Sequence, residues 1–146
     1  MHKYTVEFRI YGEGFDPLCV TKNLNLAPST VRLANEAIGT SRSPLACWGY
    51  DGRDDGGQEY WDSLEDGLMF LLNRLERVKD KLDLYRQAQD LVFWCGHFQS
   101  SFDGGPTLSP ALLQKLSEFG VGVFIDNYFS SAKEDDLEQW GAGLVL

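Results

Sequence analysis

Two segments of this chain repeat the same order of strand, capped helix and strand. Residues 6–33 carry the alternating apolar residues of a strand, then Asp16-Pro17, then a Leu-rich stretch and a second apolar run. Residues 91–125 repeat this order around Ser109-Pro110. Asp and Ser side chains cap helix starts, and proline suits the first helical position because its missing N–H would be unpaired there. Two copies of one unit predict one composite domain with a shared sheet.

A further helix is predicted between the two units. Ser63 and Asp66 form a capping pattern, in which side chains satisfy unpaired backbone N–H groups of the first turn. Apolar residues then recur at steps of three and four, which predicts one amphipathic helix of about 17 to 20 residues. Its apolar positions are Leu64, Leu68, Leu71, Leu72, Leu75, Val78 and Leu82.

The predicted order of elements over residues 1–129 is β-α-β-β-α-β-α-β, which favours a single α+β domain. We expect a mixed or antiparallel sheet of the ferredoxin-like kind, with helices on one face, built from two similar β-α-β units. Residues 130–146 contain an acidic helix candidate together with the apolar side chains Leu137, Trp140 and Leu144. We therefore expect this C-terminal extension to dock on the same domain.

The net charge of the chain limits the classes of molecule that it is expected to bind. Thirteen basic and 22 acidic residues give a net charge of −9 and a pI near 4.6. Such a charge disfavours binding to nucleic acid and favours a basic protein partner.

No apolar run approaches the ~20 residues that span a bilayer, so we expect no membrane insertion. Three widely spaced cysteines, with no signal pattern at the N-terminus, predict a reduced, cytoplasmic protein. The sequence predicts no oligomeric state.

Residues 34–58 form the longest stretch without a helix or strand pattern, and they are rich in Gly, Ser, Pro and Asp. Irregular stretches of this length are uncommon in compact domains unless they bind something or move. Aromatic and arginine side chains, which often anchor protein interfaces, lie in and beside this stretch. The candidate residues for binding a partner or ligand are Trp48, Tyr50, Asp51, Arg53, Asp55 and Trp61. Taken singly, each aromatic is equally well explained by packing in the core.

Metal and cofactor sites are poorly supported. Residues 51–62 weakly resemble a calcium-binding loop, but Arg53 stands where an oxygen ligand is needed and Asp62 replaces the bidentate glutamate. Cys95 and His97 lie on one face of a predicted strand, where a buried thiol and a strand-end imidazole explain them better than zinc, which needs further ligands. No nucleotide-binding, nucleophile-elbow or zinc-protease motif is present. We expect no metal, no cofactor and no catalytic residue.

Several spaced residues resemble a known family. They are Phe8-x-Ile10-x-Gly12, Asp16-Pro17 with Thr21 and Leu24, Pro28, Trp61 before the long helix, and Ser109-Pro110 through Gly120 to Ile125-Asp126-x-Tyr128. Over residues 4–129 the pattern is similar to a bacterial domain-of-unknown-function family, of the domain of unknown function 4279 type. The segment 36–57 departs from that pattern in being longer and richer in Gly and Asp. The resemblance implies a small bacterial cytoplasmic domain, of the kind found beside toxin genes as immunity proteins, and it implies no catalytic residues.

These observations favour a non-catalytic protein-interaction module, an immunity or antitoxin-like protein that binds a basic partner through its acidic surface and residues 36–61. The alternative is a small-ligand or metal-binding domain with its site between the sheet and the same loop. An enzyme is the third hypothesis, because no base and nucleophile pair is recognisable in the sequence.

Overall fold

The computed structural model describes residues 1–38 and 41–129. Seven strands and four α-helices occur in these ranges. The strands are β1 (His2–Gly12), β2 (Thr30–Arg32), β3 (Ala37–Ile38), β4 (Ser41–Arg42), β5 (Ala46–Tyr50), β6 (Asp90–Gln99) and β7 (Gly122–Phe129). The helices are α1 (Pro17–Leu24), α2 (Leu64–Leu75), α3 (Lys79–Arg86) and α4 (Pro110–Phe119), with short 3₁₀ turns at Arg53–Asp55 and Glu76–Val78.

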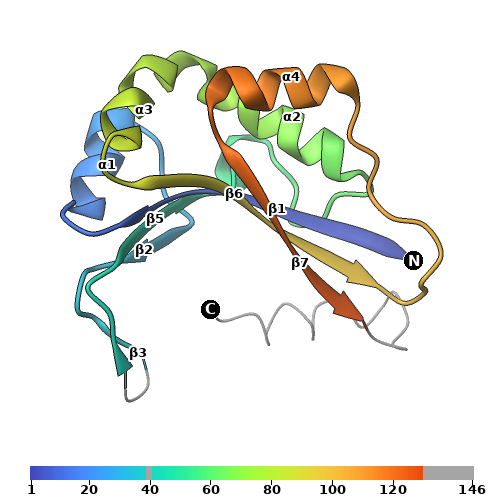
Figure 1. Ribbon diagram of the computed structural model, residues 1–146, viewed down its shortest axis with the longest axis horizontal. Coiled ribbons are helices and arrows are strands. Elements are labelled where there is room, and N and C mark those ends of the chain that lie inside the picture. The colour runs from blue at the N-terminus through green and yellow to red at the C-terminus, as the bar shows by residue number, and fades with distance from the viewer. Residues whose placement is uncertain (39–40, 130–146) are drawn as a thin grey trace.

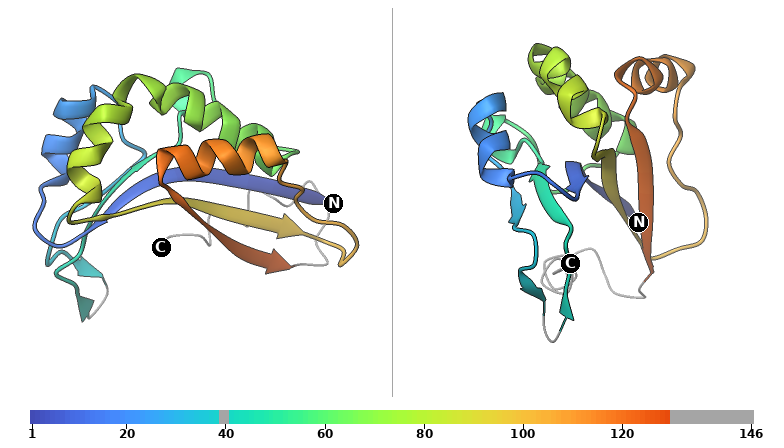
Figure 2. Two further views of the ribbon diagram at one scale, coloured as in Figure 1. Left: turned by 45° about the horizontal axis from the view of Figure 1, so that its top comes forward. Right: turned by 60° about the vertical axis from the view of Figure 1, so that its left-hand side comes forward.

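Five strands form one mixed sheet in the order β2-β5-β1-β6-β7, and β3 and β4 form a separate two-stranded sheet. The central strand β1 is antiparallel to both β5 and β6, whereas β7 runs parallel to β6. The four helices lie on one face of the five-stranded sheet (Figures 1 and 2). The predicted α+β class is therefore confirmed, as are a mixed sheet and helices on one face.

The alternating sequence of β1 determines which side chains meet the helices. Val6, Phe8 and Ile10 are buried and join the core cluster, while Glu7 and Arg9 point to the other face. Side chains of α1, α2, β5, β6 and α4 complete the same cluster. Because successive strand residues point to opposite faces, this burial leaves a polar row on the face without helices.

The capping residues predicted from the sequence begin their helices as expected. The side chain of Asp16 accepts a hydrogen bond from the Leu18 N–H, and that of Ser109 accepts one from the Leu112 N–H. Ser63 caps α2 through the Asp66 N–H. Each bond satisfies one of the amide donors that have no partner inside the helix.

The prediction of one long amphipathic helix is wrong in its continuity. After α2, the chain tightens into a 3₁₀ turn and leaves helical geometry at Val78 (φ −112°, ψ 9°) before α3 begins. This break turns α3 down toward the start of β6 (Figure 1). Leu82 consequently remains fully buried, because the redirected helix still covers the sheet.

The irregular stretch predicted at residues 34–58 is also wrong in part, because Ala46–Tyr50 form the fully buried strand β5. A short strand covered on both faces shows no alternation of polar and apolar residues, so periodicity does not reveal it. β5 pairs with β1 on one side and β2 on the other. This insertion separates β2 from β1.

The two-unit architecture and the ferredoxin-like likeness stay predictions. The strands that open the two units, β1 and β6, are antiparallel neighbours in the sheet, and α1 and α4 pack on the same core. The closing strands differ, because β7 pairs directly with β6 whereas β5 lies between β2 and β1. The predicted docking of residues 130–146 lies outside the described residues.

Candidate functional site

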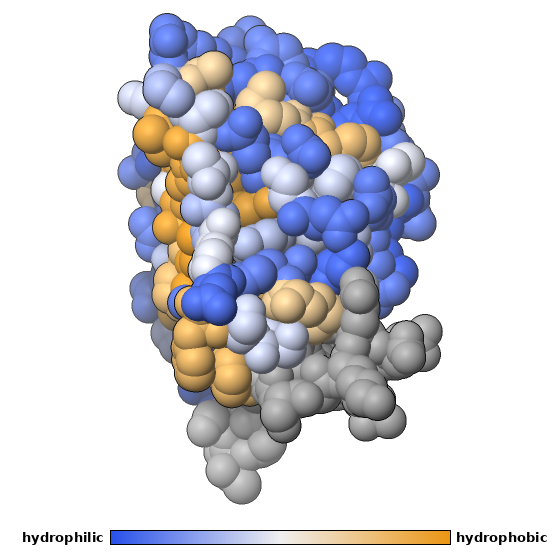
Figure 3. Space-filling view, turned by 90° about the vertical axis from the view of Figure 1, so that its right-hand side faces the viewer, coloured by the Kyte–Doolittle hydropathy of each residue, from blue (hydrophilic) through white to orange (hydrophobic). Residues whose placement is uncertain are grey.

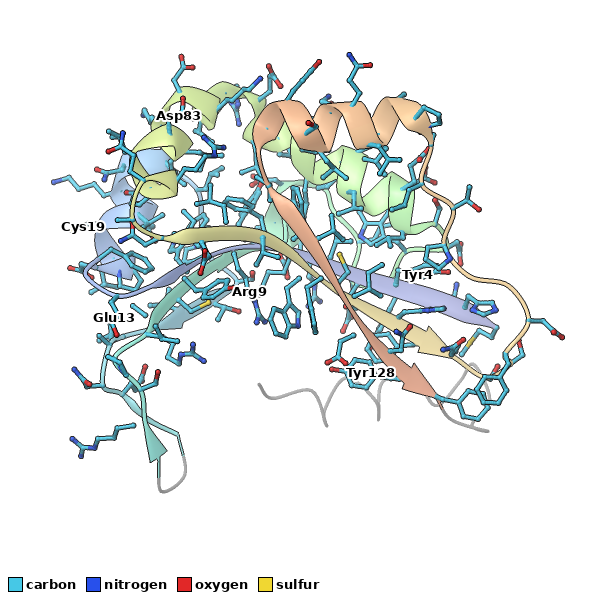
Figure 4. The ribbon with its side chains drawn as sticks, in the orientation of Figure 1. Tyr4, Arg9, Glu13, Cys19, Asp83 and Tyr128 are labelled. Atoms are coloured by element: carbon cyan, nitrogen blue, oxygen red, sulfur yellow. The ribbon has the colours of Figure 1, made fainter. Side chains whose placement is uncertain are left out.

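The face of the five-stranded sheet opposite the helices, here called the open face, carries a row of polar and aromatic side chains. No helix of residues 1–38 and 41–129 covers it (Figure 2). Arg9 and Tyr128 both project from this face (Figure 4). Its side chains, which alternate with the core residues, are those of Thr5, Glu7, Arg9, Trp94, Phe98, Phe124, Asp126 and Tyr128.

Glu7 and Arg9 form an ion pair on the open face. The Arg9 Nε donates to the Glu7 Oε1 at 2.5 Å, and the hydroxyls of Ser29 and Thr30 donate to the Glu7 Oε2 at 2.6 and 2.8 Å. The two charged side chains are only 15% and 17% exposed. Hydrogen bonds to an ionised carboxylate are stronger than neutral ones, so this network holds Arg9 in one place.

The Arg9 guanidinium also lies over the indole of Trp94, with its carbon atom 4.7 Å from the ring centre. Trp94 in turn contacts the ring of Phe124 at 4.4 Å between centroids. A cation over an aromatic face is attracted by the ring quadrupole. With its Nε paired to Glu7, Arg9 has its two Nη groups left without a hydrogen-bond partner among the described residues.

A pocket of about 300 Å³ opens beside this pair. Its floor is the sheet, and one wall is the segment between β5 and α2, which contributes Asp51, Arg53, Gln58, Glu59 and Tyr60. β5 ends opposite Phe8, so this segment lies along the first half of β1, where Trp61 forms a β-bridge with Tyr4. The sheet side is formed by Thr5, Glu7, Arg9, Thr30, Trp94 and Tyr128.

The charges of the pocket are unevenly paired. Arg53 pairs with Glu59 at 3.4 Å, and Arg9 pairs with Glu7. Asp51 accepts the backbone N–H of Arg53 at 3.0 Å but makes no ion pair with any described residue. Burial raises the pKa of the Asp51 carboxyl above its ordinary value, although the backbone N–H and the charge of Arg53 act in the opposite direction. The pocket therefore holds one carboxylate that forms no ion pair with a described residue.

Aromatic rings continue from the pocket along β6 and β7. Phe98 stacks on Tyr128 at 5.0 Å between centroids, and Tyr60 meets Phe98 edge to face at 5.8 Å. The Tyr128 hydroxyl donates to Asp126, and burial together with that bond raises the pKa of Tyr128 to about 12. Tyr128 is therefore a neutral hydrogen-bonding group at physiological pH.

The far end of the sheet exposes further apolar rings. Phe102 is 81% exposed and stacks on the half-exposed Phe129 with 4.2 Å between centroids. Nearer the start of β7, opposite Trp94, Phe124 is 43% exposed. Viewed from the end at which β6 and β7 finish, apolar residues gather in a band along one side of the molecule (Figure 3). Exposed apolar residues that gather in this way often mark an interaction surface.

Residues 2–130 match the family described as Domain of unknown function (DUF4279). The chain belongs to the DUF4279 family. No curated protein and no solved structure matches the chain. The resemblance noted from spaced residues such as Asp16-Pro17 and Ser109-Pro110 is thereby confirmed at the level of the family.

Three of the six predicted site residues of this DUF4279 domain lie in the core. Trp48 and Tyr50 are buried on the helix side of the sheet, where the Trp48 Nε1 donates to the Thr21 hydroxyl at 2.9 Å. Trp61 is 8% exposed and packs against Phe70. These side chains point away from the open face, and packing accounts for each of them.

The other three predicted residues lie in the segment beside the pocket. Asp51 and Arg53 line the pocket, as described above. Asp55 accepts the hydroxyl of Tyr50 at 2.5 Å, and its backbone carbonyl accepts a hydrogen bond from Arg74. Asp55 therefore ties the segment to the core and to α2, while Asp51 and Arg53 face the pocket.

The residues that sequence reasoning missed are Glu7, Arg9 and Trp94. Glu7 and Arg9 alternate with the core residues of β1, a pattern that places them on the opposite face of the strand but does not distinguish them from ordinary surface residues. The available signal was Trp94, a large aromatic at a position of β6 that alternates with the core residues Phe93 and Cys95. A tryptophan on the polar side of a strand indicates that this face is at least partly covered or binds something.

The described residues contain no group of three His, Cys, Asp or Glu side chains that could hold a metal. In the segment resembling a calcium loop, Arg53 pairs with Glu59, and Asp62 pairs with Lys3. His97 is hydrogen-bonded through its two ring nitrogens to His2 and Asn127. Within the described ranges, no helix is both long and apolar enough to cross a membrane.

Proposed function

We propose that this DUF4279 domain is a protein-interaction module that binds a basic protein partner on its open face. The observation that carries the proposal is the pocket in which Asp51 forms no ion pair with a described residue, while the guanidinium of Arg9 is paired with Glu7 and lies over the indole of Trp94. A half-buried carboxylate without an ion-pair partner lowers the stability of the free protein and becomes favourable when a positive group arrives.

The surroundings of the pocket have the composition of a binding surface. Tryptophan, tyrosine and arginine are the side chains that most often dominate the energy of an interface, because they bury large areas with little loss of entropy. Trp94, Tyr128 and Arg9 meet at the pocket, and Phe124 extends the apolar area toward the sheet edge. The net charge of −9 would accelerate encounter with a basic partner at low ionic strength.

The biological role that we propose is that of a cytoplasmic bacterial immunity or antitoxin-like protein, which occludes a basic partner without chemistry of its own. Its charge and its open face support this role. The partner would contact the open face of the sheet and residues 51–60, while the helix-covered core serves as the scaffold.

The proposal is tested by titrating the purified protein with the purified products of the adjacent genes. Phe124→Ser should weaken binding, because Phe124 is an exposed aromatic residue on the open face, in contact with Trp94. Leu18→Ser is the matched control, because Leu18 is 60% exposed on α1, on the helix side of the sheet. Failure of every product to bind at micromolar concentration, together with no protection in a co-expression toxicity assay, would exclude this function.

A second candidate is a small-ligand domain that uses the same pocket. The specific observation in its favour is that Arg9, whose Nη groups have no hydrogen-bond partner among the described residues, lines a pocket of about 300 Å³, a volume close to the lower limit for ligand sites. A thermal-shift screen against a metabolite library tests it, because a ligand of the native state raises the melting temperature. Metal analysis of protein purified without a histidine tag tests the metal version.

A further inference from the structure

We infer that the basic partner inserts one lysine side chain into the open-face pocket and that its ammonium group pairs with Asp51. This inference rests on the proposed function and specifies the chemistry of the group recognised. It assigns to Asp51 the role of the charged anchor and to the surrounding rings the role of walls for the lysine stem.

The charged side chains that line the pocket carry a net charge of one negative unit. Five charged side chains line it, and four of them form the pairs Glu7–Arg9 and Arg53–Glu59. Asp51 is the fifth and has no ion-pair partner among the described residues. A ligand that restores neutrality therefore brings a single positive charge.

The hydrogen bonds of Asp51 favour an ammonium over a guanidinium. The Asp51 Oδ1 already accepts the Arg53 backbone N–H, which leaves Oδ2 as the less occupied oxygen. A guanidinium binds a carboxylate best through two parallel bonds to both oxygens, whereas an ammonium is a compact point charge that needs only one. The geometry at Asp51 thus suits lysine.

The aromatic walls of the pocket suit the apolar stem of a lysine side chain. Trp94, Tyr60 and Tyr128 line the pocket and present aromatic surface to it. Lysine buries its four-carbon stem along apolar surface while its charged end reaches a polar partner. The two arginines of the pocket repel a cation, but each pairs with its own carboxylate, which offsets part of that repulsion.

The test is an NMR titration of the full-length protein with Nα-acetyl-lysine-N-methylamide. Its arginine and norleucine counterparts are the comparison probes. We expect the lysine probe to shift the indole resonance of Trp94, the arginine probe to bind several-fold more weakly, and the norleucine probe not to bind. Asp51→Asn should lower the affinity for the lysine probe about tenfold, which is the change expected for the loss of one charge-assisted hydrogen bond.

Asp54→Asn is the matched control, because it removes the same charge from an exposed residue of the same turn that does not line the pocket. It should leave the lysine titration nearly unchanged. Equal binding of the lysine and arginine probes, equal effects of the two substitutions, or no binding of the lysine probe would overturn the inference. If a protein partner binds the wild type and Asp51→Asn equally, the inference fails while the proposed function stands.

Discussion

The carboxylate of Glu7 on β1 lies directly against the backbone of Gly49 on β5. A Cβ atom added to Gly49 would lie 2.8 Å from the Glu7 Cδ, closer than such atoms normally approach. The absence of a side chain at Gly49 lets Glu7 lie flat on the sheet and reach Ser29, Thr30 and Arg9. The position of Arg9 in the pocket therefore depends on a glycine in the neighbouring strand.

Gly49→Ala should displace Glu7 and break its hydrogen bonds on the open face. Because the carboxylate is held by three partners, we expect a loss of about 1–3 kcal/mol in the free energy of unfolding, measured by urea denaturation. Gly122→Ala is the control, because a Cβ there would meet nothing within 4 Å. Equal stability of the two variants would contradict the position of Glu7.

The three cysteines should differ sharply in reactivity. Burial raises the pKa of Cys95 to about 12 and also raises that of Cys47, whereas Cys19 is exposed. Only the thiolate reacts with Ellman's reagent, so a buried thiol that stays protonated reacts slowly. At about pH 8 we expect one fast thiol in the native protein, three after unfolding, and none that is fast in Cys19→Ser. A second fast thiol in the native protein would show that β5 or β6 is more accessible than its packing indicates.

The hydrogen-bonded pair of His2 and His97 makes stability sensitive to pH. The His2 Nδ1 lies 2.8 Å from the His97 Nε2, and His97 stacks on Tyr4 and bonds Asn127. Burial lowers the pKa of His97 below 6.5, with the charge of His2 as a further cause. As pH falls, the unfolded chain takes up this proton before the native state does, so the free energy of unfolding decreases.

His97→Gln removes this titration while keeping a polar side chain. We expect the decrease in the free energy of unfolding between about pH 7 and pH 5 to be smaller in His97→Gln than in the wild type. Urea denaturation at both values measures it, and an NMR titration of the His97 ring provides an independent readout. Parallel decreases in the two proteins would mean that His97 does not contribute to the acid sensitivity.

The helix starts were predictable because their signals are local. Asp16, Ser63 and Ser109 each cap a helix through an amide two or three residues further along the chain, so a short window of sequence contains both partners. The break before α3 was not predictable in this way. The break depends on tertiary packing, because it lets α3 keep Leu82 buried against the sheet.

The cap of α4 gives a quantitative test of this local contribution. Ser109→Ala leaves the Leu112 N–H without its acceptor and should cost about 1 kcal/mol in the free energy of unfolding. Ser117→Ala in the same helix is the control, because Ser117 is exposed and alanine has the higher helix propensity. We expect Ser117→Ala to be neutral or slightly stabilising, and comparable losses in both variants would argue against the capping role.

The pocket was only partly predictable, because its two sides come from distant parts of the chain. Asp51 and Arg53 were found from the unusual composition of their loop. Arg9 and Trp94 meet only because β1 and β6 pair in the register that places Arg9 opposite Val92 and Glu7 opposite Trp94. The same loop composition pointed to Trp48 and Tyr50, whose burial follows from the hidden strand β5.

Asp51 should lower the stability of the protein when no partner is bound. Burial raises its native pKa above 3.8, so the native state holds the proton more tightly than the unfolded chain. For a raised pKa, the stabilisation is present at low pH and is lost as pH rises through the native pKa. At neutral pH the ionised, unpaired carboxylate therefore opposes folding.

Asp51→Asn removes that cost and keeps an oxygen that can accept the Arg53 N–H. We expect the variant to be more stable than the wild type at about pH 7, with the difference vanishing as pH falls below about 4. Urea denaturation at both values measures the two differences, with Asp54→Asn as the control for general charge. A less stable variant at neutral pH would show that Asp51 already has a favourable partner within the chain. A substitution that raises stability while weakening lysine binding is the behaviour expected of a group retained for binding, since such groups are kept at the expense of stability.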